Sequence, residues 1–493
     1  MINEYLFISS MFAPLLAVFA VLILPNMNST LAKSFALIAT GFSLIVSIYL
    51  WSVMYLSEKL ELFKFTTEFL SAYNLPMFGL NEISMIMYAL AAIVGFCAVL
   101  VGNASKIKNY KLYLSLLLVM QFGLLGTFAS VNMLWAYIFH EFALIPTFIA
   151  TIYWGGAGKR VASMQMAIYL TLGALISLLG LVALYFYVDA PSFDLPILLK
   201  SAYAMTDAAP AGYIFILLLI GFSILVSVFP FHSWAPRGYA AAPTAFSMLH
   251  AGVLKKFGFY MLIQLVIPIL PREALDYLPY LAIFALCNVV LIGLMTMAQR
   301  DLKLMLSYSS VSHIGICMLG VATFSVLGVG GAVLFAFGHG LSIAVLFYLA
   351  NIITNKTNKW DMNEMGGLIS RTPVLCAFFL TAILANIGLP GFANFWGELS
   401  VLVALWENNF LFCSVAALGI IISAIYGLRA VAKIFFGPSS AEFEKLTDIT
   451  FKEKIPAIIL IVALLFIGFY PRVATRMLNE KLPITLYSLN VQK

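Results

Sequence analysis

Charged residues are scarce in this 493-residue sequence: Asp, Glu, Lys and Arg make up 10% of the chain, and hydrophobic residues make up 63%. Soluble globular domains carry about 25% charged residues. The composition therefore excludes a water-soluble globule and predicts a protein of the lipid bilayer. The 27 basic residues outnumber the 21 acidic ones. They form no single patch along the chain, so we expect no nucleic acid among its partners.

Cysteine is also rare. The five cysteines fall in apolar segments without paired spacing, which argues against a disulfide framework, a zinc site or an iron–sulfur cluster. No run matches G-x-G-x-x-G or G-x-x-x-x-G-K-[ST], so nucleotide chemistry within the chain is not predicted. We expect no cofactor and no metal in this chain, and any redox energy would come from another subunit.

Long apolar runs dominate the rest of the sequence. A helix needs roughly 20 apolar residues to cross the hydrocarbon layer, and unbroken runs of this length are typical of helices rather than of barrel strands. The sequence therefore predicts an all-α membrane protein with about 14 transmembrane helices, and we expect the first to remain as a span because it lacks a signal-peptide pattern. The segments lie near 6–24, 32–55, 84–101, 110–128, 131–153, 164–188, 212–229, 241–270, 276–298, 304–325, 328–353, 372–407, 410–434 and 455–470.

The basic residues indicate the orientation. Lys and Arg concentrate in the connections of one parity, for example at Lys108, Lys111, Arg237 and Lys356. Cytoplasmic loops of membrane proteins are enriched in these residues. We therefore expect these connections on the cytoplasmic side and both termini on the outer, periplasmic side.

Two segments are interrupted by proline together with polar or small residues. The interruptions are 228–236, which closes the seventh segment, and 388–398, which splits the twelfth. Each broken segment is the fourth of a five-helix block, helices 4–8 and 9–13, and such matching breaks are expected of inverted repeats with a transport site between them. Alternatively, each proline could be a tolerated kink. The predicted divisions are 1–109 for helices 1–3, 110–270 and 271–436 for the two repeats, and 437–493 for helix 14 and the tail.

A few ionisable side chains fall inside the predicted spans, where they are costly and usually functional. Ion transfer needs groups whose protonation can change, and carboxylates, lysines and histidines placed together inside a helix bundle can meet that need. Glu141 stands about ten residues into an apolar run that continues past Pro146. The candidate site residues are Glu141, His250, Lys255, Lys256, His313, His339 and Glu398, with His232 beside the first break.

Each candidate also has a structural alternative. A single buried histidine can simply pack and hydrogen-bond, and His232 is either structural or part of an input path. Lys255 and Arg429 could extend to the membrane surface if the segment boundaries are shifted by one turn. Glu407 fits a solvated helix end.

Several motifs together resemble one family, and they occur in order between residues 80 and 440. The resemblance is to the proton-translocating antiporter-like membrane subunits of respiratory complex I and of multisubunit cation/proton antiporters. It is carried by His140-Glu141-Phe-Ala-Leu-Ile-Pro146, Phe229-Pro-Phe-His232-Ser-Trp234, Ala242-Pro243-Thr244-Ala245, Ala251-Gly-Val-Leu-Lys255-Lys256, Ala298-Gln299-Arg300-Asp301-Leu-Lys303, Tyr308-Ser-Ser-Val-Ser312-His313-Ile-Gly315 and Gly388-Leu-Pro390-Gly391-Phe-Ala-Asn-Phe-Trp-Gly397-Glu398.

Within this family, the M-type subunits of complex I typically have a glutamate in the broken twelfth helix. Glu398 occupies that position here, so the chain resembles the M-type subunits. The resemblance implies that Glu141, Lys256, His313, His339 and Glu398 form a polar axis along the membrane midplane. It also implies proton pumping coupled to quinone reduction in other subunits of a respiratory NADH:quinone oxidoreductase in a bacterial cytoplasmic (inner) membrane. The partners would be other antiporter-like and membrane subunits of the complex, the lipid bilayer and protons. The FMN, iron–sulfur clusters and quinone would be held by partner subunits rather than by this chain.

One departure from the family pattern affects this axis. The family usually has a lysine in the seventh helix that pairs with the glutamate of the fifth, but this chain reads Leu225-Val-Ser227-Val-Phe-Pro230. Either His250 or Lys255 takes its place, or the chain couples protons differently. On an ideal helix, His250 and Lys256 point in directions about 120° apart. That geometry predicts that His250 faces Glu141 while Lys256 faces the second repeat.

Two other functions remain open from the sequence. The chain could belong to a multisubunit sodium/proton antiporter or a membrane-bound hydrogenase, which would share most axis residues. It could also be a structural spacer that no longer pumps. The retention of Glu141, Lys256 and Glu398 argues against a spacer, because unpaired buried charges without a task would cost stability.

Overall fold

A computed structural model describes residues 2–23, 28–57, 63–67, 77–102, 107–188, 191–201, 208–438 and 441–481. Within these ranges the chain is helical, and extended pairing is limited to isolated bridges such as Phe78 with Ser130. The all-α prediction is therefore confirmed. The first half contains α1 (Ile2–Ile23), α2 (Ser29–Leu56), α3 (Glu82–Val101), α4 (Tyr110–Ala129), α5 (Met133–Trp154), α6 (Lys159–Tyr187), α7 (Leu195–Ser201), α8 (Ala208–Val226) and α9 (Trp234–Ala241).

The next two spans are each built from α-helical and π-helical pieces. The first joins α10 (Thr244–Leu249), η3 (His250–Leu254), α11 (Lys256–Met261), η4 (Leu262–Val266) and α12 (Ile267–Ile269), and the second joins α13 (Pro271–Cys287), η5 (Asn288–Ile292) and α14 (Gly293–Ala298). The remaining long helices are α15 (Leu302–Ala322), α16 (Val326–Thr357), α17 (Pro373–Asn386), α18 (Ala393–Asn408), α19 (Phe410–Phe435), α20 (Phe451–Phe469) and α21 (Arg472–Lys481).

Among the described residues, eleven helices are long and apolar enough to cross a membrane, or twelve if the bent pair α20–α21 counts as one. The predicted number of 14 is therefore not confirmed. The two predicted spans that fall short are the interrupted ones: α8 contributes only 210–226 as an apolar helix, and α17 and α18 are separated by a break.

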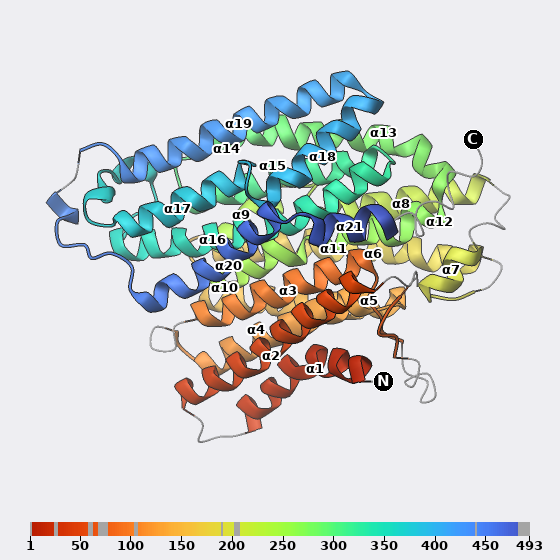
Figure 1. The fold of residues 1–493 in the computed structure, drawn as a ribbon, viewed down its shortest axis with the longest axis horizontal. Helices are drawn as coiled ribbons and strands as arrows, with labels where there is room; N and C mark the ends of the chain where they lie inside the picture. Colours follow the sequence, from red (N-terminus) through yellow and green to blue (C-terminus); the bar gives the residue numbers. More distant parts are fainter. Residues whose placement is uncertain are drawn as a thin grey trace.

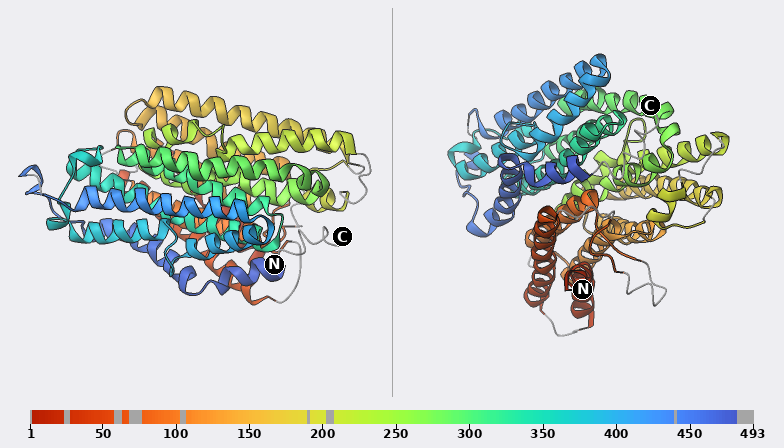
Figure 2. Two further views of the ribbon diagram at one scale, coloured as in Figure 1. Left: turned by 90° about the horizontal axis from the view of Figure 1, so that it is seen from above. Right: turned by 45° about the vertical axis from the view of Figure 1, so that its right-hand side comes forward.

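The spans run side by side as one bundle with two fully enclosed helices. Figure 1 shows α1 and α2 along its lower edge and α19 along its upper edge, and the right view of Figure 2 again places these helices at opposite edges. In the span 244–269 and in α16, every residue of the most apolar 18-residue stretch is buried, whereas only 33–39% of the residues are buried in the corresponding stretches of α1, α2, α6 and α19. Outer helices therefore present apolar side chains outward, and the inner two are surrounded by protein.

The first break lies between α8 and α9, as the sequence predicts. Proline at position 230 has no N–H to donate, so the helix cannot continue through it. Ser227 takes a left-handed backbone conformation with φ of 69°. The side chain of Asn288 accepts a hydrogen bond from the Phe229 N–H (2.6 Å) and donates to the carbonyls of Ser227 (3.1 Å) and Val311 (3.0 Å). The side-chain amide of Asn288 therefore provides hydrogen-bond partners for the backbone at the break and connects the break to α15.

The second predicted break, between α17 and α18, is also confirmed. Gly388 and Gly391 adopt φ angles of 78° and 102° on either side of Pro390, a region that disfavours residues with a Cβ. At the start of α18, the Trp396 indole donates to the carbonyl of Gly468 in α20 (2.7 Å). The break is therefore held from outside by the last long helix.

We predict that Asn288→Leu destabilises the fold through the first break. The substitution leaves one N–H and two carbonyls without their side-chain partner, and each buried polar group left unsatisfied costs about 1–3 kcal/mol. The midpoint of thermal denaturation of the purified protein should fall, whereas Asn355→Leu, at an exposed asparagine, should leave it unchanged. Equal midpoints for the two variants would contradict the role of Asn288.

Candidate functional site

The ionisable residues predicted from the sequence lie mainly on the two enclosed spans and on the helices beside them. His250, Lys255 and Lys256 come from the span 244–269, and each is at most 2% exposed. His339, on α16, and His313, on α15, are also buried. Glu398, on α18, is 6% exposed. The structure therefore encloses six of the predicted site residues within the bundle.

A π-helical turn sets the directions of the two lysines. In η3 the Lys255 N–H donates to the carbonyl of His250, five residues earlier (3.1 Å), so the turn holds an extra residue. The Lys256 Nζ donates back to the carbonyl of Ala251 in that turn (2.7 Å). The ideal-helix geometry was therefore wrong here. The hydrogen bonds of Lys256 stay within its own span, and Lys255 is the lysine that reaches α15.

Lys255 links the first enclosed span to the second half of the bundle. Its Nζ donates to both the carbonyl (2.6 Å) and the hydroxyl (2.8 Å) of Ser310, on α15. The ammonium group also lies 5.5 Å from the centre of the Tyr239 ring, within the range of a cation–π contact. An extension of Lys255 to the membrane surface is thus excluded, because its charge is bonded inside the protein.

The hydroxyl of Ser310 leads on to the two histidines. Ser310 Oγ lies 3.2 Å from His339 Nε2, and the His339 and His313 rings stack with centres 5.1 Å apart and planes 17° from parallel. His313 Nδ1 lies 2.9 Å from the carbonyl and 3.3 Å from the hydroxyl of Ser309. The predicted pair of histidines is therefore brought together, with a serine on each side.

From Ser309 the hydrogen bonds continue to the second break. Ser309 Oγ is 2.9 Å from the Tyr426 hydroxyl and accepts from Asn386 Nδ2 (3.4 Å). Ser342 bridges the two asparagines: its hydroxyl donates to Asn386 Oδ1 (3.2 Å) and accepts from Asn394 Nδ2 (3.3 Å). We call this set the polar chain; its members are Lys255, Ser310, His339, His313, Ser309, Tyr426, Asn386, Ser342 and Asn394.

Glu398 lies at the far end of the polar chain, one turn after Asn394 on α18. Its carboxylate packs against the backbone of Gly388, where an added methyl group would collide with Oε2. Its charge also interacts with Tyr426. The carboxylate therefore fills the space that the unwound backbone leaves between α17 and α18.

The serines, asparagines and tyrosine of the polar chain were not among the predicted site residues. Serine and asparagine occur throughout membrane helices, and composition does not distinguish a relay from ordinary packing. The sequence contained one indication of the serines, the motif Tyr308-Ser-Ser-Val-Ser312-His313. In this motif three serines lie within the five residues before a histidine. Tyr426 had no such signal in the sequence.

Glu141 does not lie inside the helix bundle, where the sequence predicts it. Its side chain is 43% exposed in this chain, so it faces the outside of the bundle rather than an interior pocket. The nearest basic group is the adjacent residue: His140 Nδ1 lies 3.8 Å from Glu141 Oε1. His140 is 2% exposed, and its ring stacks on Phe257 with centres 4.1 Å apart. The described residues contain no ion pair or hydrogen bond between Glu141 and His250.

His250 instead packs among aromatic rings. The centres of the Trp234 and Tyr239 rings lie 5.6 Å and 5.0 Å from its own. Nδ1 of His250 and Nδ1 of His140 have no hydrogen-bond partner among the described residues. Buried polar atoms without a protein partner are usually satisfied by water. This half of the bundle therefore offers sites for bound water between α5 and the lysines.

The remaining predicted residues lie at the edges. His232 is half-buried at the first break and stacks on Phe229. Arg429 donates to the carbonyl of Gln299 (3.1 Å), at the end of α14, as expected for a residue that extends to the membrane surface. Glu407 is exposed near the end of α18, which confirms the solvated helix end.

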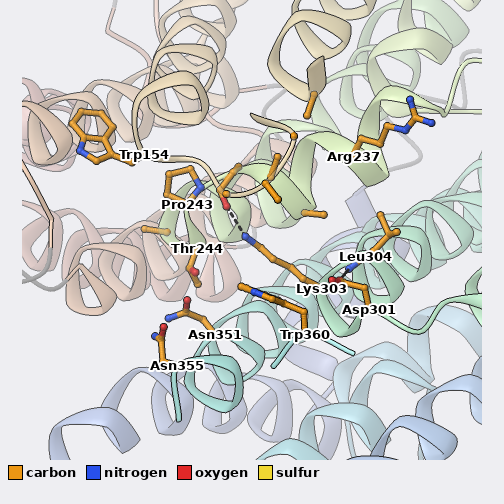
Figure 3. Close-up of a pocket in the computed structure, with 18 of the residues that line it drawn as sticks. Trp154, Arg237, Pro243, Thr244, Asp301, Lys303, Leu304, Asn351, Asn355 and Trp360 are labelled. Carbon is orange, nitrogen blue, oxygen red and sulfur yellow. Dashed lines mark hydrogen bonds between the residues drawn. The ribbon is translucent and has the colours of Figure 1, made fainter. Parts of the chain in front are cut away.

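A cavity of about 890 Å³ opens at the end of the bundle where α5, α9, α10 and α15 meet. Figure 3 shows Lys303 extended into it between Trp360 and Pro243, with Asn351 and Asn355 facing it. The Lys303 ammonium donates to the carbonyl of Ala242 (2.5 Å). Burial raises the pKa of Asp301 above its ordinary value, although hydrogen bonds from the backbone N–H groups of Leu304 and Lys303 oppose this. We call this cavity the vestibule.

The vestibule approaches the lysines along α10. Thr244 lines it, and His250 lies six residues further along the span, about 9 Å at 1.5 Å per residue. Among the described residues, no group of three or more His, Cys, Asp and Glu side chains is placed to hold a metal ion. The arrangement thus combines a polar entrance, buried basic groups and a polar chain that ends at Asn394, one turn before the Glu398 carboxylate.

Comparisons with known proteins agree on one family. The family model described as "NADH:quinone oxidoreductase/Mrp antiporter, TM" matches residues 130–425. The chain is 30% identical over 463 residues to NADH-ubiquinone oxidoreductase chain 4 of Chondrus crispus, with 93% of each chain covered. It is 31% identical over 398 residues to NADH-quinone oxidoreductase subunit M of Rickettsia conorii, covering 80% of this chain and 79% of that one.

Solved structures share the fold over nearly the whole length. A chain of respiratory complex I from Thermus thermophilus with bound NADH is similar with a TM-score of 0.86 and 25% identity, covering 97% of this chain and 99% of that one. A chain of the Mrp complex from Dietzia sp. is similar with a TM-score of 0.85 and 17% identity, covering 99% of each. At that identity the second likeness concerns the fold alone.

We predict that Gly388→Ala lowers stability more than Gly437→Ala does. Both glycines have positive φ angles, 78° and 90°, so the backbone cost of about 1–2 kcal/mol is shared. Only at Gly388 does the new methyl group meet the Glu398 carboxylate, because nothing lies within 4 Å of a Cβ at Gly437.

The measurement is the midpoint of thermal denaturation of each purified variant. Adding Glu398→Ala to Gly388→Ala should recover part of the difference by removing the collision. Equal losses at the two glycines, or no recovery in the double variant, would show that the carboxylate does not lie against Gly388.

Proposed function

The chain belongs to the NADH:quinone oxidoreductase/Mrp antiporter family of membrane subunits, and from this premise we propose that it is the M-type, proton-translocating subunit of a respiratory NADH:quinone oxidoreductase. It would sit in a bacterial cytoplasmic (inner) membrane beside other antiporter-like subunits, with both termini on the outer side. The whole complex would be the enzyme. This chain would carry protons, and partner subunits would hold the FMN, iron–sulfur clusters and quinone.

The polar chain is the observation that supports this proposal most. Hydroxyl and imidazole groups can each accept a proton on one side and release one on the other, and such groups follow one another from Lys255 to Tyr426, with the two imidazoles in stacked contact. Such groups are costly inside a membrane protein and mark ion pathways. A structural spacer would have no need to carry a buried lysine, two stacked histidines and a buried carboxylate on one line.

Protons would enter from the cytoplasmic side through the vestibule. Lys303 and Asp301 would exchange protons with water there, and His250 would pass them towards Lys255 and Lys256. Quinone reduction elsewhere would change the charge next to the axis, and repulsion between like charges would drive the proton along the polar chain. Glu398 would release it outward at the second break, where the backbone is already open.

The domain divisions follow the same proposal. The block 110–270 would form the entry half and the block 271–436 the exit half, joined through Lys255 and Ser310. An alternative as a sodium/proton antiporter subunit is less well supported. The relatives at 30–31% identity carry names of quinone oxidoreductase subunits, whereas the Mrp chain shares the fold at 17% identity.

His140 would serve as the basic partner of Glu141. The position of the family's usual lysine holds Leu225 here, and the structure places His140 Nδ1, without a hydrogen bond, 3.8 Å from the carboxylate. Charges influence each other's protonation strongly within about 4–6 Å. A proton on His140 would therefore stabilise the ionised carboxylate at membrane depth, and loss of that proton would release it.

We predict that Lys255→Met and Lys256→Met each reduce redox-driven proton pumping strongly, by about tenfold or more, while the complex still assembles. Lys255 supplies the link to the exit half, and Lys256 supplies a second basic group directly after the π-helical turn η3. Lys359→Met is the matched control, because Lys359 pairs with Glu364 at the surface (3.4 Å) and surface pairs contribute about 0–1 kcal/mol.

Pumping is measured in proteoliposomes from the quenching of a pH-sensitive dye after addition of NADH. Electron transfer to quinone in detergent serves as the check on assembly. Control-level pumping by either assembled lysine variant would disprove the proposed axis.

We also predict that His140→Phe impairs pumping about as much as Glu141→Gln. Phenylalanine keeps the ring stacked on Phe257 but removes both nitrogens. Because the two residues would act as a pair, the double variant should be no worse than either single variant, and His140→Lys should retain part of the activity. Additive losses, or full activity in His140→Phe, would rule out the pairing, and the same proteoliposome assay distinguishes these results.

A further inference from the structure

A second hollow lies on the outer side of the bundle beside the vestibule, with which it shares Val161 and Arg237. It is a groove of about 560 Å³ lined by the first turns of α6 and by one residue of α9. The left view of Figure 2 shows α6, in yellow-orange, along the outer edge of the bundle. The lining residues are Arg160, Val161, Met164, Gln165, Ile168, Tyr169 and Arg237.

Two arginines line this groove, and no carboxylate lines it. Arg160 is the second residue of α6, and Arg237 comes from α9, far away in the sequence. Both are exposed, and neither forms an ion pair among the residues that the structure describes. The groove therefore carries two unneutralised positive charges where α6 enters the membrane.

One arginine is held in position by a row of hydrogen bonds. Arg237 Nη1 donates to Gln165 Oε1 (3.5 Å), and Gln165 Nε2 donates to the hydroxyl of Ser233 (3.1 Å). Ser233 in turn donates to the Tyr169 hydroxyl (3.2 Å). These contacts hold the guanidinium group at the groove that it lines, and a guanidinium has five N–H donors, so others remain for a ligand.

An apolar stripe continues from the arginines along α6. Met164 is 62% exposed and Ile168 is 58% exposed, and they lie one and two turns beyond Arg160, about 6 and 12 Å into the membrane. The exposed residues Leu172, Leu175 and Leu179 extend the stripe over the rest of the helix. A ligand here must therefore be negatively charged at one end and apolar over a length of several turns.

We propose that this groove binds an anionic phospholipid, with the phosphate between Arg160 and Arg237 and one acyl chain along α6. Guanidinium groups bind phosphate oxygens in a forked geometry that lysine lacks. The net positive charge favours an anionic headgroup over a zwitterionic one, because the ammonium of a zwitterionic lipid would face two arginines. The apolar stripe distinguishes a lipid from a free phosphate or a nucleotide.

The proposal is tested on the intact complex in lipid nanodiscs made of phosphatidylethanolamine with one-fifth phosphatidylglycerol. Native mass spectrometry after detergent release counts the phosphatidylglycerol molecules that stay bound. The double variant Arg160→Gln/Arg237→Gln should retain phosphatidylglycerol at least about tenfold more weakly, because each charge-assisted hydrogen bond is worth about a factor of ten. Arg371→Gln, at an exposed arginine outside the groove, should match the unmodified complex.

Two further measurements separate the possible occupants. A photoreactive phenylalanine analogue at Ile168 should cross-link to lipid; cross-linking to a neighbouring protein instead would overturn the proposal in favour of a subunit contact. Inorganic phosphate should not displace the bound phosphatidylglycerol, and displacement would assign the groove to small anions. If the double variant fails to assemble, Arg160→Gln alone makes the same comparison, and undiminished retention there overturns the proposal.

Discussion

The contact between Lys255 and Ser310 is the constraint on which the arrangement of this molecule depends. A lysine with 2% exposure cannot leave its charge unsatisfied inside a bilayer protein. Two oxygens of one serine on α15 satisfy it, so the halves of the bundle must pack closely enough to keep that distance. The stacked histidines and the second break continue from the same serine. Separation of the halves would expose the lysine and interrupt every later contact.

The breaks illustrate what could be read from the sequence. Pro230 and Pro390 each remove a backbone donor, and the glycines around Pro390 permit positive φ, so the two interruptions follow from covalent structure alone. The enclosed positions of His313, His339 and Glu398 likewise follow from apolar runs that surround them. The π-helical turn at His250 could not be predicted, because it arises from packing between α10 and its neighbours rather than from any residue preference. The exposure of Glu141 also depends on which face of α5 the other helices cover.

His140 shows how a single neighbour can change the interpretation of a motif. Its place directly before Glu141 is visible in the sequence, yet adjacent residues of a helix point in different directions, and the sequence predicts only His250 or Lys255 as a partner of Glu141. The structure places the imidazole nitrogen 3.8 Å from the carboxylate all the same, since a long glutamate side chain can turn back towards the ring. In the polar chain, Asn386, Asn394 and Tyr426 could not be recognised from the sequence, because no pattern distinguishes them from other polar residues of membrane helices.

The burial of the apolar stretches of the span 244–269 and of α16 has a consequence for biogenesis. During synthesis each span leaves the translocon into lipid before its later neighbours exist, and a span with two lysines is poorly suited to that environment. Its final surroundings include α15 and α16, which are made afterwards. The two lysines must therefore wait in the translocon, or beside the earlier helices α3 and α8, until the second half arrives. Assembly of this chain is thus expected to become irreversible only late in translation.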